Sequence, residues 1–159
     1  MRWLWQTGQT WKSEMNGSAT VIDASLAVKL VLPNPLRAQC RTVIDRLMHE
    51  GHKLIAPTLW TYETTSTVCK AIHFGHLTTE EGRRVLDHLA RLGVQQIPPD
   101  ETQNRRALEW SLRLKRVAAY DSYYLALAET FQCNLWTADR RLVNVVHLSW
   151  VRWAGEASE

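Results

Sequence analysis

The chain has 159 residues, 45% hydrophobic and 22% charged, which is enough for one domain with its own core and excludes a disordered or fibrous protein. Its formal net charge of +3 is modest, but 14 of the 19 basic residues are arginine. The planar guanidinium of arginine suits phosphate oxygens, which favours an anionic partner, although a solvated basic surface explains the same composition.

No segment predicts a membrane span or a secretory signal. The apolar runs are shorter than the roughly 18 residues that a span requires, and Lys29 interrupts the run 25–32. The three cysteines, Cys40, Cys69 and Cys133, are far apart and lie in or beside apolar stretches, which is typical of buried thiols in a reducing compartment. We therefore expect a cytoplasmic protein without disulfides or zinc.

The N-terminal segment differs from the rest of the chain. Residues 1–18 contain three tryptophans among polar residues and show neither helix nor strand periodicity, which predicts an appended arm that need not be ordered. Met15 stands just before the first regular element, so the arm could also come from an upstream start. We expect the folded domain to cover residues 19–155.

The first half of the chain predicts two strands and three helices. Residues 19–23 form a short apolar strand, which leads into a helix over 25–32 that two prolines end. A second helix, over 35–51, carries one apolar face and ends at a glycine. A strand over 52–57 then leads into a helix over 58–75.

The second half continues this alternation. A threonine followed by acids predicts the start of one helix, and Asp100 predicts the cap of another. The expected elements are helices over 78–93, 100–114, 121–131 and 140–146, and strands over 94–98, 134–139 and 148–153. Strands that alternate with helices predict an α/β fold, in which a parallel sheet is covered by helices on both faces.

Four acids fall at the same end of this predicted sheet. Asp23 and Asp139 end strands, Glu63 lies in the first turns of a helix that follows a strand, and Asp121 opens a helix. Ligands of such sheets bind beyond the carboxyl ends of the strands, so the four acids could share one crevice. Taken singly, each acid also fits a helix cap or a charge that complements the helix dipole. Together they would repel one another without a cation, and oxygen ligands select magnesium or manganese, which predicts a metal site for phosphate chemistry.

Four segments, VIDASLAVK, TYE, AAYDSYYLALAE and LWTADRRLVN, together resemble the PIN-domain ribonucleases over roughly residues 19 to 153. The resemblance implies a three-layer α/β/α fold with a five-stranded parallel sheet. For a stand-alone domain of this size it also implies the VapC-type toxin of a toxin–antitoxin pair, with RNA as substrate and a cognate antitoxin as partner. The residues that it implies as catalytic and metal-binding carboxylates are Asp23, Glu63, Asp121 and Asp139.

This resemblance, with the chemistry of the acids, gives each carboxylate an expected role. One or two Mg²⁺ or Mn²⁺ ions would polarise the scissile phosphate and activate a water for in-line attack. We expect Asp23 and Asp121 to bind the metal directly. Glu63 and Asp139 would bind through water or orient the attacking water.

Two pairs of side chains beside these acids complete the predicted site. Ser25 and Thr137 would fix the carboxylate rotamers, although a hydroxyl bond to nearby backbone explains them equally well. Arg140 and Arg141 are candidates for contacts with RNA phosphates, although a solvated helix face explains them as well.

Other functions fit parts of this pattern. A phosphotransfer receiver or an aspartyl phosphatase would need an acid pair near the first strand or a lysine after a late strand, whereas Ala24 and Ser25 follow Asp23. An RNA-processing nuclease of the PIN fold outside a toxin–antitoxin system, and a non-catalytic binding module of the same fold, are the remaining alternatives. Apolar helix faces and surplus tryptophans predict a homodimer that a small antitoxin captures.

Overall fold

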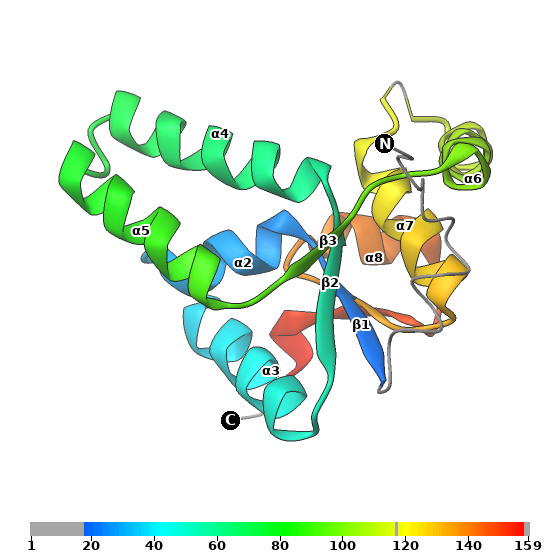
Figure 1. Ribbon diagram of the computed structural model, residues 1–159, viewed down its shortest axis with the longest axis horizontal. Coiled ribbons are helices and arrows are strands. Elements are labelled where there is room, and N and C mark those ends of the chain that lie inside the picture. The colour runs from blue at the N-terminus through cyan, green and yellow to red at the C-terminus, as the bar shows by residue number, and fades with distance from the viewer. Residues whose placement is uncertain (1–17, 117, 158–159) are drawn as a thin grey trace, which may run out of the picture.

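The structure, a computed structural model, describes residues 18–116 and 118–157 (Figure 1). Apart from Ser18, the expected N-terminal arm lies outside these residues. The described residues form a central sheet with helices on both faces, as the alternation of elements predicts.

Five parallel strands form the sheet, in the order β3-β2-β1-β4-β5. The strands are β1 (Ala19–Ile22), β2 (Lys53–Pro57), β3 (Gln95–Ile97), β4 (Leu135–Thr137) and β5 (Val151–Trp153). The chain builds outward from β1 to β3 and then returns to place β4 on the free side of β1. The strand order therefore reverses between β1 and β4, and the expected five-stranded parallel sheet is confirmed.

The helices that cover the sheet begin and end close to their predicted limits. Their bounds are α2 (Ala24–Val31), α3 (Arg37–His49), α4 (Leu59–His73), α5 (Thr79–Arg91), α6 (Glu101–Arg113), α7 (Tyr120–Phe131) and α8 (Arg140–Val146), followed by the short 3₁₀ turn η1 (Ala154–Glu156). The cap of α5 is Thr78 rather than Thr79, the other threonine that the sequence allowed, and the predicted cap Asp100 of α6 is confirmed. Each side chain accepts a hydrogen bond from the backbone N–H three residues later.

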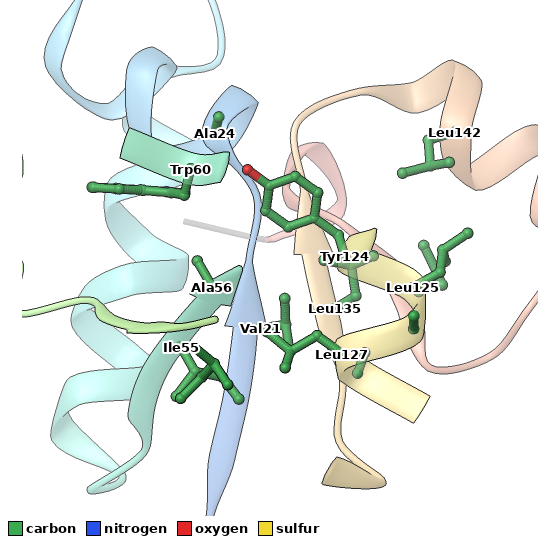
Figure 2. Close-up of a cluster of buried hydrophobic side chains, with 14 of the residues drawn as sticks. Val21, Ala24, Ile55, Ala56, Trp60, Tyr124, Leu125, Leu127, Leu135 and Leu142 are labelled. Carbon is green, nitrogen blue, oxygen red and sulfur yellow. The ribbon is translucent and has the colours of Figure 1, made fainter. Parts of the chain in front are cut away.

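The alternation of side chains along β1 divides the core between the two faces of the sheet. Val21 packs with Ile55 and Leu135 in a cluster that includes the buried face of α7, as Figure 2 shows. Ile22 points the other way and joins a second cluster with buried residues of α3. The sheet is therefore the middle of three layers, as the family resemblance implies.

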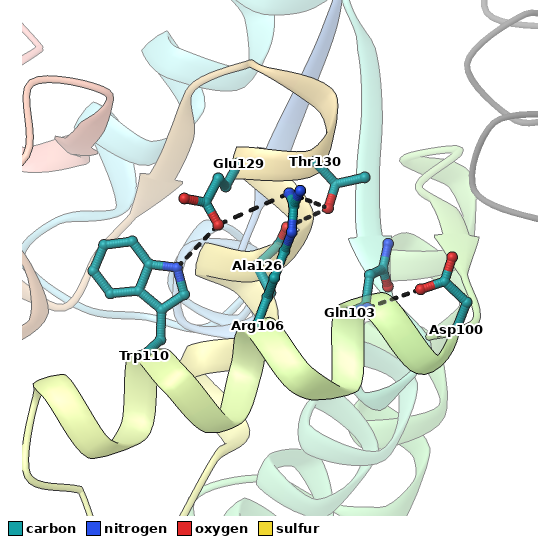
Figure 3. A network of polar contacts seen from close by, with 7 residues as sticks. All are labelled: Asp100, Gln103, Arg106, Trp110, Ala126, Glu129 and Thr130. Atoms are coloured by element: carbon teal, nitrogen blue, oxygen red, sulfur yellow. Dashed lines mark hydrogen bonds and ion pairs between the residues drawn. The ribbon is translucent and has the colours of Figure 1, made fainter.

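Side chains hold α6 against α7 along much of their length (Figure 3). Glu129 on α7 accepts a hydrogen bond from the indole nitrogen of Trp110, at 3.4 Å, and lies 3.9 Å from the guanidinium of Arg106. The same guanidinium donates to the Thr130 hydroxyl at 3.2 Å. Nearer the start of α7, the buried hydroxyls of Ser111 and Ser122 lie 2.8 Å apart. These contacts fix the helix that carries Asp121.

Two of the single-residue alternatives and one local prediction do not hold. Asp121 does not cap α7, because the N–H of Tyr123 already donates to the carbonyl of Ala119, which places Asp121 inside the first turn. Glu63 is not a first-turn acid, because α4 begins at Leu59 and its first turn holds no acid. Cys69 is exposed on α4 rather than buried.

No helix among residues 18–116 and 118–157 is long and apolar enough to cross a membrane.

Candidate active site

The reversal of strand order between β1 and β4 opens a crevice at the carboxyl ends of these strands. Beyond the paired residues Ile22 and Trp136, the N–H of Asp23 donates to the carbonyl of Trp136 at 3.1 Å. This backbone bond continues the strand register by one step and brings Asp23 beside Thr137.

Asp23 is tied to the loop after β4 by two hydroxyl groups. The Ser25 hydroxyl donates to Oδ1 of Asp23 at 2.8 Å, and the Thr137 hydroxyl donates to Oδ2 at 2.5 Å. The same two hydroxyl oxygens accept hydrogen bonds from the backbone N–H groups of Ala138 and Asp139, at 3.0 and 2.9 Å. Each hydroxyl thus donates a hydrogen bond to Asp23 and accepts one from the backbone of the loop.

The N–H of Leu26 completes the set of donors to Asp23, because it donates to Oδ1 at 2.9 Å and makes Asp23 the N-cap of α2. A carboxylate offers about four acceptor positions, so one position on Oδ2 is left after these three bonds. Asp23 is therefore both the helix cap that its sequence position predicts and a carboxylate with one oxygen open to a further ligand.

Burial raises the pKa of Asp23 to about 6, against the opposing effect of hydrogen bonds from Thr137, Leu26 and Ser25. The charge of Asp121 raises this pKa further. The pKa of Asp23 stays raised although its carboxylate accepts three hydrogen bonds. A buried carboxylate in this condition lacks a positively charged neighbour.

Glu63, on the second turn of α4, reaches the same crevice. The phenol of Tyr124 donates to Oε1 of Glu63 at 3.1 Å, which ties α4 to α7 across 61 positions of sequence. Burial raises the pKa of Glu63 to about 7; the Tyr124 hydrogen bond lowers it, and the charges of Asp23 and Asp121 raise it.

Asp121 and Asp139 are less buried than Asp23, and both are half-buried. Burial raises the pKa of Asp121, Arg116 opposes this rise, and the charge of Asp139 adds to it. Asp139 also caps α8, because its Oδ1 accepts the N–H of Arg141 at 2.9 Å.

The structure thus brings Asp23, Glu63 and Asp121 within electrostatic reach of one another, and Asp139 within reach of Asp121. Asp23 is in hydrogen-bond contact with Ser25 and Thr137, as predicted. As they stand, no three His, Cys, Asp or Glu side chains of the described chain could hold a metal ion by themselves. The donor set still fits a hard cation, since its ligands are all oxygens, and burial together with neighbouring acidic charge raises the pKa values of Asp23, Glu63 and Asp121.

Arg140 and Arg141 lie outside this set of acids. Both are exposed on α8, and with Ser25 and Asp139 they line a pocket of about 500 Å³ next to the crevice. A larger pocket, of about 720 Å³, lies at the opposite edge of the sheet. Its lining includes a single acid, Glu50, so it lacks the carboxylate set and is not the candidate site.

The sequence analysis missed Tyr124, Arg116 and Lys29 as members of the site. Tyr124 lies one helical turn after Asp121 and Lys29 one turn after Ser25, so spacing of three or four residues from a predicted site residue was the available signal. Arg116 lies in the loop between α6 and α7, where no such spacing could point to it.

Comparisons with known proteins identify the family of the chain. A family model described as the PIN domain matches residues 20–148. Ribonuclease VapC9 of Mycobacterium tuberculosis is 34% identical over 122 residues, which cover 77% of this chain and 87% of that protein. VapC ribonuclease Mb0985 of Mycobacterium bovis matches with the same identity and coverage.

Solved structures show the same fold at lower identity. The crystal structure of VapBC2 from Rickettsia felis, bound to a DNA fragment from its promoter, matches with a TM-score of 0.62 and 13% identity, over 82% of this chain and 95% of that chain. FitAcB from Neisseria gonorrhoeae matches with a TM-score of 0.57 and 19% identity, over 76% of this chain and 87% of that chain. Because the family model spans most of the residues and the relatives at 34% identity cover 77% of the chain, the protein belongs to the PIN-domain family.

Proposed function

We propose that this protein is an Mg²⁺- or Mn²⁺-dependent endoribonuclease and the toxin of a toxin–antitoxin pair. The observation that carries the proposal is the set of carboxylates at the carboxyl ends of β1 and β4: Asp121 interacts electrostatically with the other three, and three of the four have raised pKa values. The relatives named VapC ribonuclease support RNA as the substrate. A cytoplasmic location belongs to the same proposal.

Each side chain has a role that its contacts support. Asp23 offers its open position on Oδ2 as a direct metal ligand, and Asp121 is the second direct ligand. Ser25 and Thr137 hold the Asp23 carboxylate in one rotamer. Glu63, held by Tyr124, and Asp139 act through water or orient the attacking water.

A cation fits this division of roles. Mg²⁺ usually keeps several waters and takes only one or two carboxylates from a protein, so two direct ligands and two acids behind water suffice. When bound, the cation would neutralise the scissile phosphate and lower the pKa of the attacking water.

The first prediction concerns the metal. With EDTA present, the purified protein should leave single-stranded RNA uncut, and an excess of MgCl₂ or MnCl₂ should restore cleavage. Without the cation, the carboxylates repel both one another and the phosphate. The measurement is gel analysis of a labelled RNA, with Asp121→Asn protein purified in parallel as a control for contaminating nucleases. Full cleavage in EDTA contradicts metal dependence.

The second prediction concerns Asp121. The substitution Asp121→Asn should reduce cleavage by roughly 100-fold or more, since a direct ligand should matter at least as much as the residues that orient ligands. In EDTA the variant should melt at the same temperature as the parent or higher, because one of several like charges is removed.

Thermal melting of the two proteins with and without MgCl₂ provides the second measurement. Mg²⁺ should stabilise the parent more than the variant, since a ligand that binds only the folded state raises its stability. The matched control is Asp45→Asn, which changes an exposed acid on α3. An active Asp121→Asn protein with an unchanged magnesium shift rules out Asp121 as a ligand.

The third prediction concerns pH. The folded-state pKa of Glu63 lies above the ordinary value of 4.5, at about 7, so its ionisation destabilises the metal-free fold progressively as pH rises between these values. The Glu63→Gln variant keeps an acceptor for Tyr124 and avoids that charge. In EDTA, the free energy of unfolding of Glu63→Gln should therefore increase relative to that of the parent as pH rises from 4.5 to 7.

Urea unfolding at several pH values measures this gain. Excess Mg²⁺ should shrink it, because the cation favours the ionised form of the parent. The exposed acid Glu109 provides the control Glu109→Gln, which should follow the parent. If Glu63→Gln also follows the parent at every pH, Glu63 does not belong to a crowded acid cluster.

The fourth prediction concerns partners. Leu108 and Leu112, one turn apart on α6, are 58% and 69% exposed, and we assign the expected self-association to this face. Light scattering should give a dimer for the parent and a monomer for the double variant Leu108→Lys/Leu112→Lys. Met48→Lys, at another exposed apolar side chain, serves as the control.

The antitoxin belongs to the same prediction. Tyr62, near the start of α4, and Phe74, its C-cap, are 73% and 67% exposed and are the candidate apolar contacts for the antitoxin. Co-expression with the product of an adjacent small gene should yield a complex in which that product suppresses cleavage. A monomeric parent, or a parent that no such product binds, contradicts the respective half of the prediction.

A further inference from the structure

A basic pocket adjoins the carboxylate crevice at the start of α8. It measures about 500 Å³ and is lined by Ser25, Lys29, Leu36, Ala138, Asp139, Arg140, Arg141 and Trp153. Three of these residues are cations, and the one acid, Asp139, faces the crevice as well. The pocket and the crevice therefore share the wall formed by Ser25 and Asp139.

Lys29 brings its charge into this pocket from α2. Its side chain is half-buried, and its ammonium donates to the carbonyl of Ala138 at 3.2 Å. An ammonium has three donors, so this contact fixes the position of the charge and leaves two donors for a ligand. Arg140 and Arg141 stand across the same pocket on α8.

The guanidinium of Arg140 is positioned by Trp153. Its central carbon lies 4.6 Å from the centroid of the indole ring, a cation–π contact. Gly155 packs closely against the same ring, and a Cβ at that position would overlap the ring atoms. The indole is thus held by the backbone of η1 and holds Arg140 in turn, while the edges of the guanidinium keep their donors for an anion.

These contacts favour a phosphate over a base as the ligand. Arg140 lies over the Trp153 ring and Gly155 packs against it, so the ring has little surface on which a base could stack. The pocket instead offers a fixed ammonium and a supported guanidinium, a combination that suits phosphate oxygens.

We propose that Lys29 and Arg140 bind a backbone phosphate of the RNA strand next to the scissile phosphate, and that Trp153 is a positioning residue for Arg140. This inference rests on the proposed function, because the shared wall makes the two phosphates neighbours on one strand. In this proposal the RNA strand leaves the carboxylate crevice through the basic pocket.

Binding measured without cleavage tests the inference. Fluorescence anisotropy of a labelled single-stranded RNA oligonucleotide in EDTA should show about tenfold weaker binding for Lys29→Met and for Arg140→Gln than for the parent. Each variant should also lower the slope of log K against log salt by about 0.7, the value for one lost phosphate contact on a single strand. The controls are Lys53→Met and Arg91→Gln, which remove exposed cations beside a different pocket.

A double-mutant cycle tests the role of Trp153. Trp153→Leu keeps every charge but should weaken RNA binding several-fold. In the Arg140→Gln background the same substitution should cause no further loss of binding. A purely structural role for Trp153 predicts instead that the two losses add. Additive losses overturn the positioning role.

Neutral methylphosphonate linkages, placed one at a time along the oligonucleotide, locate the phosphate. One linkage next to the cleaved bond should weaken binding to the parent and cost nothing further in Lys29→Met. If Lys29→Met melts at a lower temperature than the parent, Lys29→Arg is compared with the parent instead. Lys29→Arg keeps a cation near the Ala138 carbonyl and should bind RNA as the parent does. Binding by Lys29→Met and Arg140→Gln that equals the controls overturns the inference.

Cleavage in Mg²⁺ by the parent separates the two proposals. If the parent does not cleave RNA but binds it through Lys29, the proposed function fails and the pocket stands. If the parent cleaves RNA while both pocket variants bind normally, the proposed function stands and the pocket assignment fails.

Discussion

The site depends on one arrangement: the carboxylate of Asp23 is the meeting point of the loop after β1 and the loop after β4. The hydroxyls of Ser25 and Thr137 each give a proton to Asp23 and receive a backbone N–H from the second loop. Two of these hydrogen bonds, from Thr137 to Asp23 and from Ala138 to Ser25, join segments more than 110 positions apart in sequence. The two central strands lie side by side, and the geometry of their ends is set by a charged group rather than by apolar packing alone.

The buried acids of this arrangement destabilise the metal-free fold electrostatically. Asp23 is buried with three donors, yet its pKa is raised, and Glu63 and Asp121 are raised as well. An apolar crevice would be more stable without a ligand, because buried like charges favour protonation or unfolding. A cation removes this destabilisation, which ties occupancy of the site to the stability of the fold.

Positive charges beside this site come from α2, from α8 and from the loop before α7. Arg116, in the loop before α7, lowers the pKa of Asp121, and Lys29 and Arg140 line the adjoining pocket. The acids thus face the crevice while the cations surround it. Such a separation of charge suits a polyanion whose central phosphate meets a cation and whose neighbouring phosphates meet side chains.

Much of this could be read from the sequence, and the limits have physical causes. Short apolar strands and one-faced helices alternate clearly, so the sheet and the position of acids at its edge were predictable. The contact between Glu63 and Tyr124 was not, because it joins two helices 61 positions apart. The start of α7 was misjudged because an aspartate in the first turn and an aspartate at the cap have the same pattern. Lys29 was seen only as a charge that interrupts an apolar run.

The packing of Gly155 against Trp153 links two positions in a way that neither residue alone reveals. A side chain at residue 155 would displace the indole, and a smaller residue at 153 would remove the reason for a glycine two residues later. The two positions are therefore sterically coupled: a side chain at position 155 fits beside a residue smaller than tryptophan at 153, but not beside the indole. The 3₁₀ turn η1, which at the level of the fold only follows β5, thereby sets the position of the ring that contacts Arg140 in the pocket.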